Sequence, residues 1–260
     1  MPEGHTLHRL AEQLRPIVGG KVAASSPQGR FADGAARIDG WRLEAVEAVG
    51  KHLLFDFEDA VLHVHLGLAG SMFASDPGGE PRPGVRLRLV DEARTVAWNL
   101  AAPTRCELWS DDEREALLRR LGPDPLRGDD PQPAFDRISR SDRTIGDLLL
   151  DQSVVAGIGN VFRAEVLYCC GVHPNRPGRS LTPGDLTCLW ETTTRLMGRG
   201  VREGRISTVD PSPEDGPEAP DAPAARYVYK QEACRRCGGP VTSWALGPRV
   251  AYACETCQPR

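Results

Sequence analysis

Hydrophobic side chains recur with helical spacing near the start of the chain. Leu7, Leu10, Ala11 and Leu14 fall on one face of a helix, and Pro16 follows them. Because proline cannot continue a helix, this pattern predicts an amphipathic helix that ends before residue 16. Such a helix can hold the first residues of the chain against a hydrophobic core.

After residue 50 the hydrophobic pattern changes to that of strands. Residues 53–57, 61–66, 85–89 and 95–98 alternate between apolar and polar or are continuously apolar, with glycine and proline clusters between them. Short strands separated by turn residues are typical of antiparallel sheets. The pattern therefore predicts a β-sandwich or a barrel in the N-terminal half.

The helical period returns at Asp111 and dominates the chain as far as an acidic segment after residue 205. Gly122-Pro123 ends the first of these helices and begins a connector. Thr144 and Asp147 resemble a capping box, with Asp in place of Glu, in front of three leucines. The order of the elements predicts an α+β chain with more than one domain.

Length and composition set the class of protein. A chain of 260 residues with 40% hydrophobic residues can form a real core and two domains. It has no apolar run near the ~18 residues of a membrane span, and Glu3 and His5 stand where a signal peptide would be apolar. We therefore expect a cytoplasmic protein.

Charge is unevenly distributed along the chain. The net charge of -4 argues weakly against a polyanionic partner. Five acidic residues, however, lie in the proline-rich stretch 210–223, for which we predict a disordered loop over about 205–224. The segment that follows is locally basic, which favours contact with phosphates.

Four of the eight cysteines have the spacing of a metal site. Two Cys-x-x-Cys pairs, separated by sixteen residues, bring four thiolates around one tetrahedral zinc: Cys234, Cys237, Cys254 and Cys257. Four thiolates leave no open position for water, so this zinc is structural. The other cysteines have no ligand spacing and are expected to be small core residues: Cys106, Cys169, Cys170 and Cys188.

The first residues can carry nucleophilic chemistry. Removal of Met1 leaves Pro2 with a secondary amine whose pKa, roughly 8, lies below that of lysine. Such an amine can attack an aldehyde carbon and form an iminium, and Glu3 is within reach to transfer protons. The alternative is that Met-Pro is merely a common start.

A second segment suits a phosphate. Gly157 and Gly159 stand just before a helical run, where successive backbone N–H groups at a helix N-terminus bind anions. Asn160 can add a side-chain donor. The alternative is a turn that only packs two helices together.

Several motifs together resemble a known family. MPEG at residues 1–4, Gly50-Lys51, LGPDPL at 121–126, DQSVVAGIGNVFRAE at 151–165 and the four-cysteine segment ending in Gln258 occur in this order. The chain is thereby similar to the formamidopyrimidine-DNA glycosylase and endonuclease VIII family of base-excision repair enzymes. The start MPEGHTLHRL looks like an actinobacterial endonuclease VIII.

The resemblance implies roles for individual residues. Pro2 would be the nucleophile that forms a Schiff base, Glu3 the general acid, and Lys51 a phosphate ligand beside the lesion. The turn from Gly157 through Gly159 to Asn160 would be the helix-two-turns-helix that grips DNA. Arg249, five residues before Cys254, would clamp the phosphates around the flipped nucleotide.

The chain departs from the family pattern in two places. Thr6 stands where many members have Glu, so it is given no role. The segment 101–106 lacks the Arg-x-Phe pair of the guanine-directed branch, which leaves Leu68 as the residue expected to fill the space of the extruded base. A core position for Leu68 remains the alternative.

The expected organisation is a β-sandwich with the catalytic N-terminal helix over 1–121, a linker over 122–130, a helix-two-turns-helix domain over 131–230 and a zinc finger over 231–260. The expected activity is that of a bifunctional DNA glycosylase and AP lyase that removes oxidised pyrimidines by β,δ-elimination. Double-stranded DNA with an oxidised base or abasic site is the expected partner, for a monomer that works at the nucleoid.

Three alternatives to this activity remain. The first is a family member directed at 8-oxoguanine and formamidopyrimidines. The second is a zinc-finger DNA-binding protein without catalysis, which would leave Pro2, Glu3 and Lys51 unexplained. The third is a tautomerase with an N-terminal proline base, which would need neither the zinc site nor the phosphate turn.

Overall fold

The computed structural model describes residues 2–209 and 225–260. The chain divides into two compact units, residues 1–120 and 121–260. Each unit has its own hydrophobic core. Among the described residues no helix is long and apolar enough to cross a membrane.

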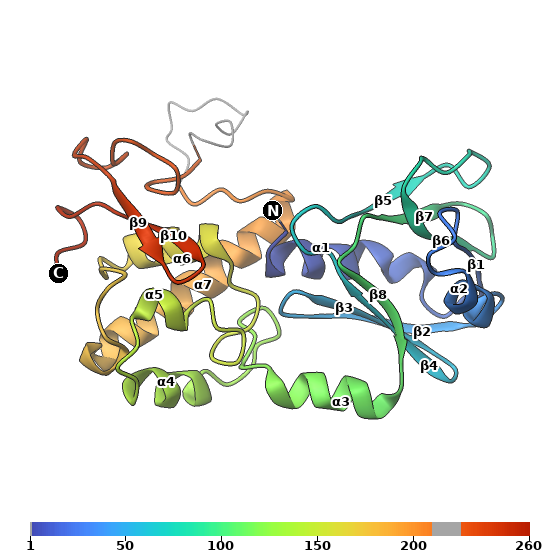
Figure 1. Ribbon diagram of the computed structural model, residues 1–260, viewed down its shortest axis with the longest axis horizontal. Helices are drawn as coiled ribbons and strands as arrows, with labels where there is room; N and C mark the ends of the chain where they lie inside the picture. Colours follow the sequence, from blue (N-terminus) through green and yellow to red (C-terminus); the bar gives the residue numbers. More distant parts are fainter. Residues whose placement is uncertain (1, 210–224) are drawn as a thin grey trace. The chain divides into compact units, whose positions relative to one another are not determined.

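The first unit is a sandwich of two four-stranded antiparallel sheets (Figure 1). One sheet has the strand order β1 (Val22–Ser25), β6 (Val85–Asp91), β7 (Ala97–Ala101) and β5 (Ser71–Ser75). The other has the order β2 (Leu43–Val49), β3 (His52–Phe57), β4 (Ala60–His65) and β8 (Arg105–Trp109). This arrangement confirms the predicted β-sandwich.

Helix α1 (Gly4–Leu14) packs against β2 and β3. Its apolar face is buried, with Leu7, Leu10 and Leu14 at most 6% exposed, and a short 3-10 turn at Arg15–Ile17 follows. Two further helices, α2 (Ala32–Ile38) and α3 (Asp111–Arg120), complete the unit. The predicted amphipathic helix is confirmed, and it holds the N-terminus against the core as expected.

The sequence pattern did not predict β1, β2, β5 and β8, and among the predicted strands the start of β7 differs by two residues. Thr95 and Val96 were expected to begin a strand, but β7 begins at Ala97. The side chain of Asp91 accepts hydrogen bonds from the backbone N–H groups of Thr95 and Val96, at 2.8 and 2.7 Å. This carboxylate closes a turn and so delays the strand by two residues.

The second unit is mainly helical. Its helices are α4 (Gln132–Ser139), α5 (Ile145–Leu148), α6 (Asn160–Cys169) and α7 (Pro183–Glu203), with a 3-10 turn at Gly178–Ser180. A two-stranded hairpin, β9 (Thr242–Leu246) and β10 (Arg249–Ala253), packs against α6 (Figure 1). The expected return strand around Val250–Tyr252 is confirmed as β10.

Helix ends in this unit are set by side-chain caps. Thr144 accepts a hydrogen bond from the N–H of Asp147 at the start of α5, as the sequence predicted. A complete capping box, which the sequence analysis did not identify, stands at Thr182 and Asp185 before the long helix α7. Gly204 ends that helix in the left-handed conformation, with φ of 72°.

Two of the cysteines expected in the core are bonded to each other. Cys170 and Cys188 form a disulfide that joins the end of α6 to α7. The prediction that they are simple core residues is therefore wrong. The two cysteines are 18 residues apart and belong to no recognisable sequence motif. The packing of the helices brings them together, so the sequence did not predict the bond. Cys106 is buried, in agreement with the prediction.

The predicted acidic loop falls mainly on residues 210–224, which lie outside the described residues. The described residues on either side of this gap meet at the buried carboxylate of Glu165 in α6. It accepts hydrogen bonds from the hydroxyl of Thr208 and from the backbone N–H groups of residues 227–229. Thr208 is only 1% exposed, so the loop that the sequence predicted from about residue 205 begins later than expected, because residues 205–209 are part of the described structure.

Candidate active site and nucleic-acid interface

Pro2 and Glu3 stand at the N-terminal end of α1. Pro2 is partly exposed, whereas Glu3 is fully buried at the N-cap position of the helix. The side chain of Glu3 makes no cap hydrogen bond to the helix, so its role is not that of an ordinary N-cap. A carboxyl group in a buried place, one peptide bond from a solvent-accessible proline, has the arrangement of an acid next to a nucleophile.

His5 is a neighbour of this pair that the sequence analysis used only as an argument against a signal peptide. It is 4% exposed, and its Nε2 atom lies 3.3 Å from the hydroxyl of Thr6. Burial lowers the pKa of His5 to about 4, so the imidazole is uncharged at neutral pH. The only signal in the sequence was its position two residues after Glu3.

Lys51 occupies the two-residue turn between β2 and β3. Gly50 precedes it with φ of 58°, a conformation that glycine adopts without strain, and Val49 pairs with His52 across the turn. Because β2 and β3 pack against α1, the same unit carries Lys51 and the Pro2-Glu3 pair. Lys51 is only partly exposed. Burial is the largest cause of the lowered pKa of His52 and of His65, and the positive charge of Lys51 lowers both pKa values further.

Leu68 lies in the tight turn between β4 and β5 and is 62% exposed. The alternative of a core position is therefore wrong. Gly67 has φ of 69°, and a Cβ atom there would lie 1.8 Å from the hydroxyl oxygen of Thr104. At Gly70 a Cβ atom would lie 2.2 Å from the carbonyl oxygen of Leu66. The two glycines thus allow a compact turn that presents an apolar side chain to solvent.

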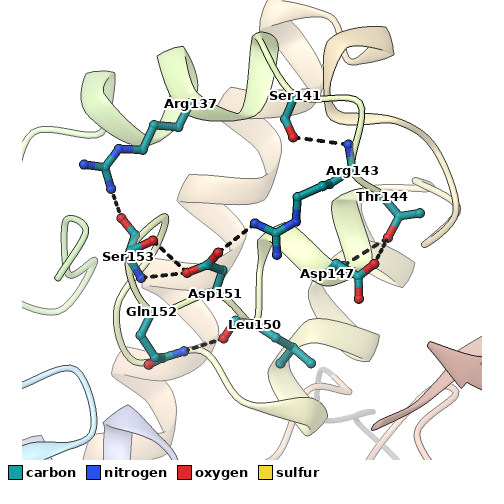
Figure 2. A network of polar contacts seen from close by, with 9 residues as sticks. All are labelled: Arg137, Ser141, Arg143, Thr144, Asp147, Leu150, Asp151, Gln152 and Ser153. Carbon is teal, nitrogen blue, oxygen red and sulfur yellow. Dashed lines mark hydrogen bonds and ion pairs between the residues drawn. The ribbon is translucent and has the colours of Figure 1, made fainter. Parts of the chain in front are cut away.

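The turn with Gly157 and Gly159 follows a network of polar contacts, of which those among Arg143, Asp151 and Ser153 are drawn in Figure 2. The amide of Gln152 accepts a hydrogen bond from the N–H of Gly157 at 3.0 Å and donates one to the carbonyl of Ile158 at 3.1 Å. Asp151 accepts hydrogen bonds from Ser153 and from the guanidinium of Arg143, the latter at 2.7 Å. The network fixes the backbone that leads into α6.

Asn160 begins α6, and its side chain contacts the hairpin. Its Nδ2 atom donates to the carbonyl of Val250 at 3.1 Å, and its Oδ1 atom accepts from the guanidinium of Arg163 at 2.5 Å. Arg163 is 1% exposed and also donates to Val250, at 2.8 Å. Nothing in the sequence around Arg163 indicated a partner 87 residues away, so this buried arginine was not predicted.

Arg249 directly precedes Val250, whose carbonyl group accepts the hydrogen bond from Asn160. It is the first residue of β10 and is exposed, after a turn in which Gly247 has φ of 56°. The structure thus brings together two predicted phosphate-binding positions of the second unit, Asn160 and Arg249. Both lie at the junction of α6 and the hairpin.

The four predicted zinc ligands converge. The sulfur atoms of Cys234, Cys237, Cys254 and Cys257 all lie within 4.8 Å of one another. Two of the separations are 3.5 and 3.9 Å, near the ~3.8 Å that a tetrahedron with Zn–S bonds of about 2.3 Å requires. The hydroxyl of Tyr168, on α6, lies 3.2 Å from the sulfur of Cys234. This set fits a structural zinc ion.

The zinc site is fixed to the helical core by one more side chain. Gln258, fully buried, accepts a hydrogen bond from the N–H of Cys254 at 3.1 Å and donates to the carbonyl of Val172 at 2.9 Å. A folded zinc site therefore sets the place of the hairpin against α6, and with it the place of Arg249.

Comparison with protein families supports this geometry. Residues 1–115 match the formamidopyrimidine-DNA glycosylase N-terminal domain, and residues 121–212 match the formamidopyrimidine-DNA glycosylase H2TH domain. Together the two matches cover most of the chain.

Individual relatives agree with the family models. The chain is 43% identical to Endonuclease 8 1 of Mycobacterium tuberculosis, over 99% of this chain and 100% of the relative. It is 33% identical to formamidopyrimidine-DNA glycosylase of Thermus thermophilus, over 99% and 98% of the two chains. The fold is that of Lactococcus lactis Fpg, solved with a Fapy-dG-containing DNA, at a TM-score of 0.81, 22% identity and full coverage of both chains. The chain therefore belongs to the formamidopyrimidine-DNA glycosylase and endonuclease 8 family and is a DNA glycosylase and AP lyase.

Proposed function

We propose that this enzyme removes oxidised pyrimidines from double-stranded DNA through a Schiff base on Pro2. One observation carries the proposal: a fully buried Glu3 stands next to Pro2 at the start of α1, in a chain of this family. The buried carboxyl of Glu3 acts as the acid, and the amine of the partly exposed Pro2 acts as the nucleophile. The sugar of the damaged nucleotide is the electrophile.

Pro2 can act as a nucleophile once Met1 has been removed. The positive end of the α1 macrodipole disfavours a second positive charge nearby, which favours the neutral amine. The nitrogen lone pair attacks C1′, the bond from C1′ to the base breaks, and the base departs with the electron pair and takes up the proton that the Pro2 nitrogen loses. The uncharged imidazole of His5 adds no positive charge that would repel the resulting iminium.

Glu3 supplies the proton that opens the sugar. Protonation of the ring oxygen by Glu3 lets the bond between that oxygen and C1′ break, which leaves an iminium between Pro2 and the open-chain sugar. The iminium acidifies the hydrogen on C2′, so that the 3′ phosphate departs by β-elimination. The 5′ phosphate departs by δ-elimination, which leaves a one-nucleotide gap.

Four side chains of this enzyme are expected to contact the DNA. Lys51 binds a phosphate beside the lesion through its ammonium group. Leu68, exposed at its turn, fills the stack after the base is extruded. In the second unit Arg249 binds phosphate through its exposed guanidinium. The amide nitrogen of Asn160 has one hydrogen for Val250 and a second for a phosphate at the N-terminus of α6.

The lesion class can be tested directly. The missing Arg-x-Phe pair in residues 101–106 and the likeness to an endonuclease 8 favour oxidised pyrimidines. A pyrimidine that has lost aromatic stacking also costs less to extrude. In single-turnover reactions we expect faster excision of thymine glycol than of 8-oxoguanine opposite cytosine. The reverse order would assign the enzyme to the guanine-directed branch and leave the Pro2 mechanism intact.

Loss of zinc should weaken DNA binding through Arg249. We expect Cys234→Ser to lose the metal and to unfold the hairpin, because a structural zinc supplies the local folding free energy. Zinc content by mass spectrometry and affinity for abasic DNA are the measurements. Arg249→Ala is the matched control, since it should weaken binding with zinc still present. Normal DNA affinity in a zinc-free protein would contradict the prediction.

Borohydride trapping tests the Schiff-base chemistry of the proposed function. An AP lyase that works through a Schiff base becomes covalently attached to DNA with an abasic site when borohydride reduces the imine. Neither a tautomerase nor a zinc-finger protein without catalysis would form this adduct. We expect a stable protein–DNA band, and its absence with a correctly processed N-terminus would reject the proposal.

A further inference from the structure

The sheet face that points away from the core of the first unit carries a cavity of about 530 Å³. On β3 and β4, His52, His63 and His65 alternate with Leu53, Leu62 and Val64, which belong to the core. Helix α3 packs against β4 and β8 and borders the cavity. Besides the histidines, the lining includes Trp109, Arg105 and Arg120. None of these aromatic and cationic residues has a role in the chemistry at Pro2.

Two of the histidines form an ordered pair. The Nδ1 atom of His52 lies 2.8 Å from Nε2 of His63, and the His63 ring stacks on Trp109 with centroids 3.7 Å apart. His63 is 1% exposed, and its Nδ1 atom is buried without a hydrogen-bond partner. A buried N–H without an acceptor is rarer than an unused acceptor, so Nδ1 of His63 is the atom without hydrogen.

This assignment determines which atom His52 offers to a ligand. With its hydrogen on Nε2, His63 donates to Nδ1 of His52. The hydrogen of the neutral His52 ring must then be on Nε2. Burial, followed by nearby positive charge, lowers the pKa of both His52 and His63 to about 3, so both rings are neutral. His52 therefore offers an N–H donor through the ring nitrogen that His63 does not use.

The charges around the cavity favour an anion. Burial has the largest effect on the pKa of His52, and the positive charges of Arg120, Lys51 and Arg105 lower it further. Of the two acidic residues in the lining, Glu107 accepts hydrogen bonds from Arg105 and Trp109, and Glu113 accepts one from the backbone N–H of Ser110. The carboxylates are thus engaged, while Arg120 makes no ion pair among the described residues.

A metal ion fits the cavity less well than an anion. Among residues 2–209 and 225–260, the four cysteines are the only group of three or more side chains whose ligand atoms converge. The three imidazoles therefore do not form a ready chelate.

We propose that this cavity binds a phosphate group, with His52 as a direct donor, Arg120 as a cation and His63 as the residue that positions His52. The source of the phosphate is the DNA backbone, next to the phosphate assigned to Lys51, so this part of the inference rests on the proposed function. The cavity would extend the DNA-binding surface along α3.

Affinity for abasic duplex DNA at several salt concentrations tests the two direct contacts. Arg120→Ala should lower the slope of log affinity against log salt by about one, because one cationic contact is lost. Its neighbour on α3 provides the control: Arg119, 70% exposed and outside the cavity, should leave the slope unchanged when replaced by Ala. His52→Phe should weaken binding about tenfold at every salt concentration, since a neutral donor releases no counterion.

Titration with inorganic phosphate, followed by ¹⁵N NMR of the imidazoles, tests the site without DNA. We expect His52 to carry its hydrogen on Nε2 and its signals to shift as phosphate is added. His63→Phe keeps a ring on Trp109 but removes the hydrogen bond to His52. It should therefore change the tautomer ratio of His52 and weaken the phosphate response, whereas a merely structural role would leave the tautomer unchanged. Circular dichroism confirms that each variant is folded.

The outcomes distinguish DNA from a free phosphate compound as the source of the phosphate. They also distinguish failure of the phosphate site from failure of the proposed function. A phosphate response together with weaker DNA binding by the variants supports the whole proposal. A phosphate response with unaltered DNA binding supports the site but assigns it to a free phosphate compound instead of DNA. Unchanged His52 signals together with unaltered DNA binding would overturn it. Because the NMR experiment needs no catalysis, failure of the Pro2 mechanism would show separately, in borohydride trapping.

Discussion

An enzyme whose N-terminus is extended by an uncleaved tag should have no detectable strand cleavage on DNA with an abasic site. In that protein the nitrogen of Pro2 is a tertiary amide, whose lone pair is delocalised into the carbonyl and cannot attack C1′. The expected loss is complete, because no other step replaces formation of the iminium. Gel electrophoresis of a labelled duplex measures the cleavage.

Proteolytic removal of the tag from the same preparation provides the control. Cleavage should return once Pro2 has a free amine, while DNA affinity should be similar in both forms. Full activity of the extended protein would show that another amine performs the attack. Lys51 would then be the first candidate.

Replacing Glu3 by Gln should slow base excision by ~100-fold or more, the usual scale for a lost general acid. Glutamine keeps the size and the hydrogen-bonding capacity of the buried side chain but has no transferable proton. Single-turnover rates on a duplex with thymine glycol, together with DNA affinity, are the measurements. Affinity should change little, because the effect is on proton transfer.

Glu12→Gln is the matched control for this variant. Glu12 lies on the same helix α1 but is exposed, so its replacement should leave both rate and affinity unchanged. If Glu3→Gln lost affinity and activity in parallel, Glu3 would be mainly a structural residue of the N-terminus.

The parts of the fold that depend on local pattern could be predicted from the sequence. The spacing of Leu7, Leu10 and Leu14 predicted α1, and runs of alternating or continuously apolar residues predicted β3, β4 and β6. The cysteine spacing predicted a cluster that the structure confirms. In each case the information lies within a few residues, or in a spacing that only one kind of ligand requires.

Contacts between distant segments could not be predicted in this way. The bond from Asn160 to Val250 and the disulfide between Cys170 and Cys188 depend on how helices and hairpin pack. The same holds for the pair of His52 and His63, which adjacent strands bring together. A polar residue within an apolar strand indicates a buried polar contact, but the sequence does not show which residue is its partner.

If Pro2 is the covalent nucleophile, the reduced adduct must be on its nitrogen. The enzyme is incubated with DNA containing an abasic site in the presence of borohydride, digested with protease and nuclease, and examined by mass spectrometry. We expect the sugar remnant on the N-terminal peptide, attached to the nitrogen of Pro2. An adduct on Lys51, or on either of the other two lysines, Lys21 and Lys230, would contradict it.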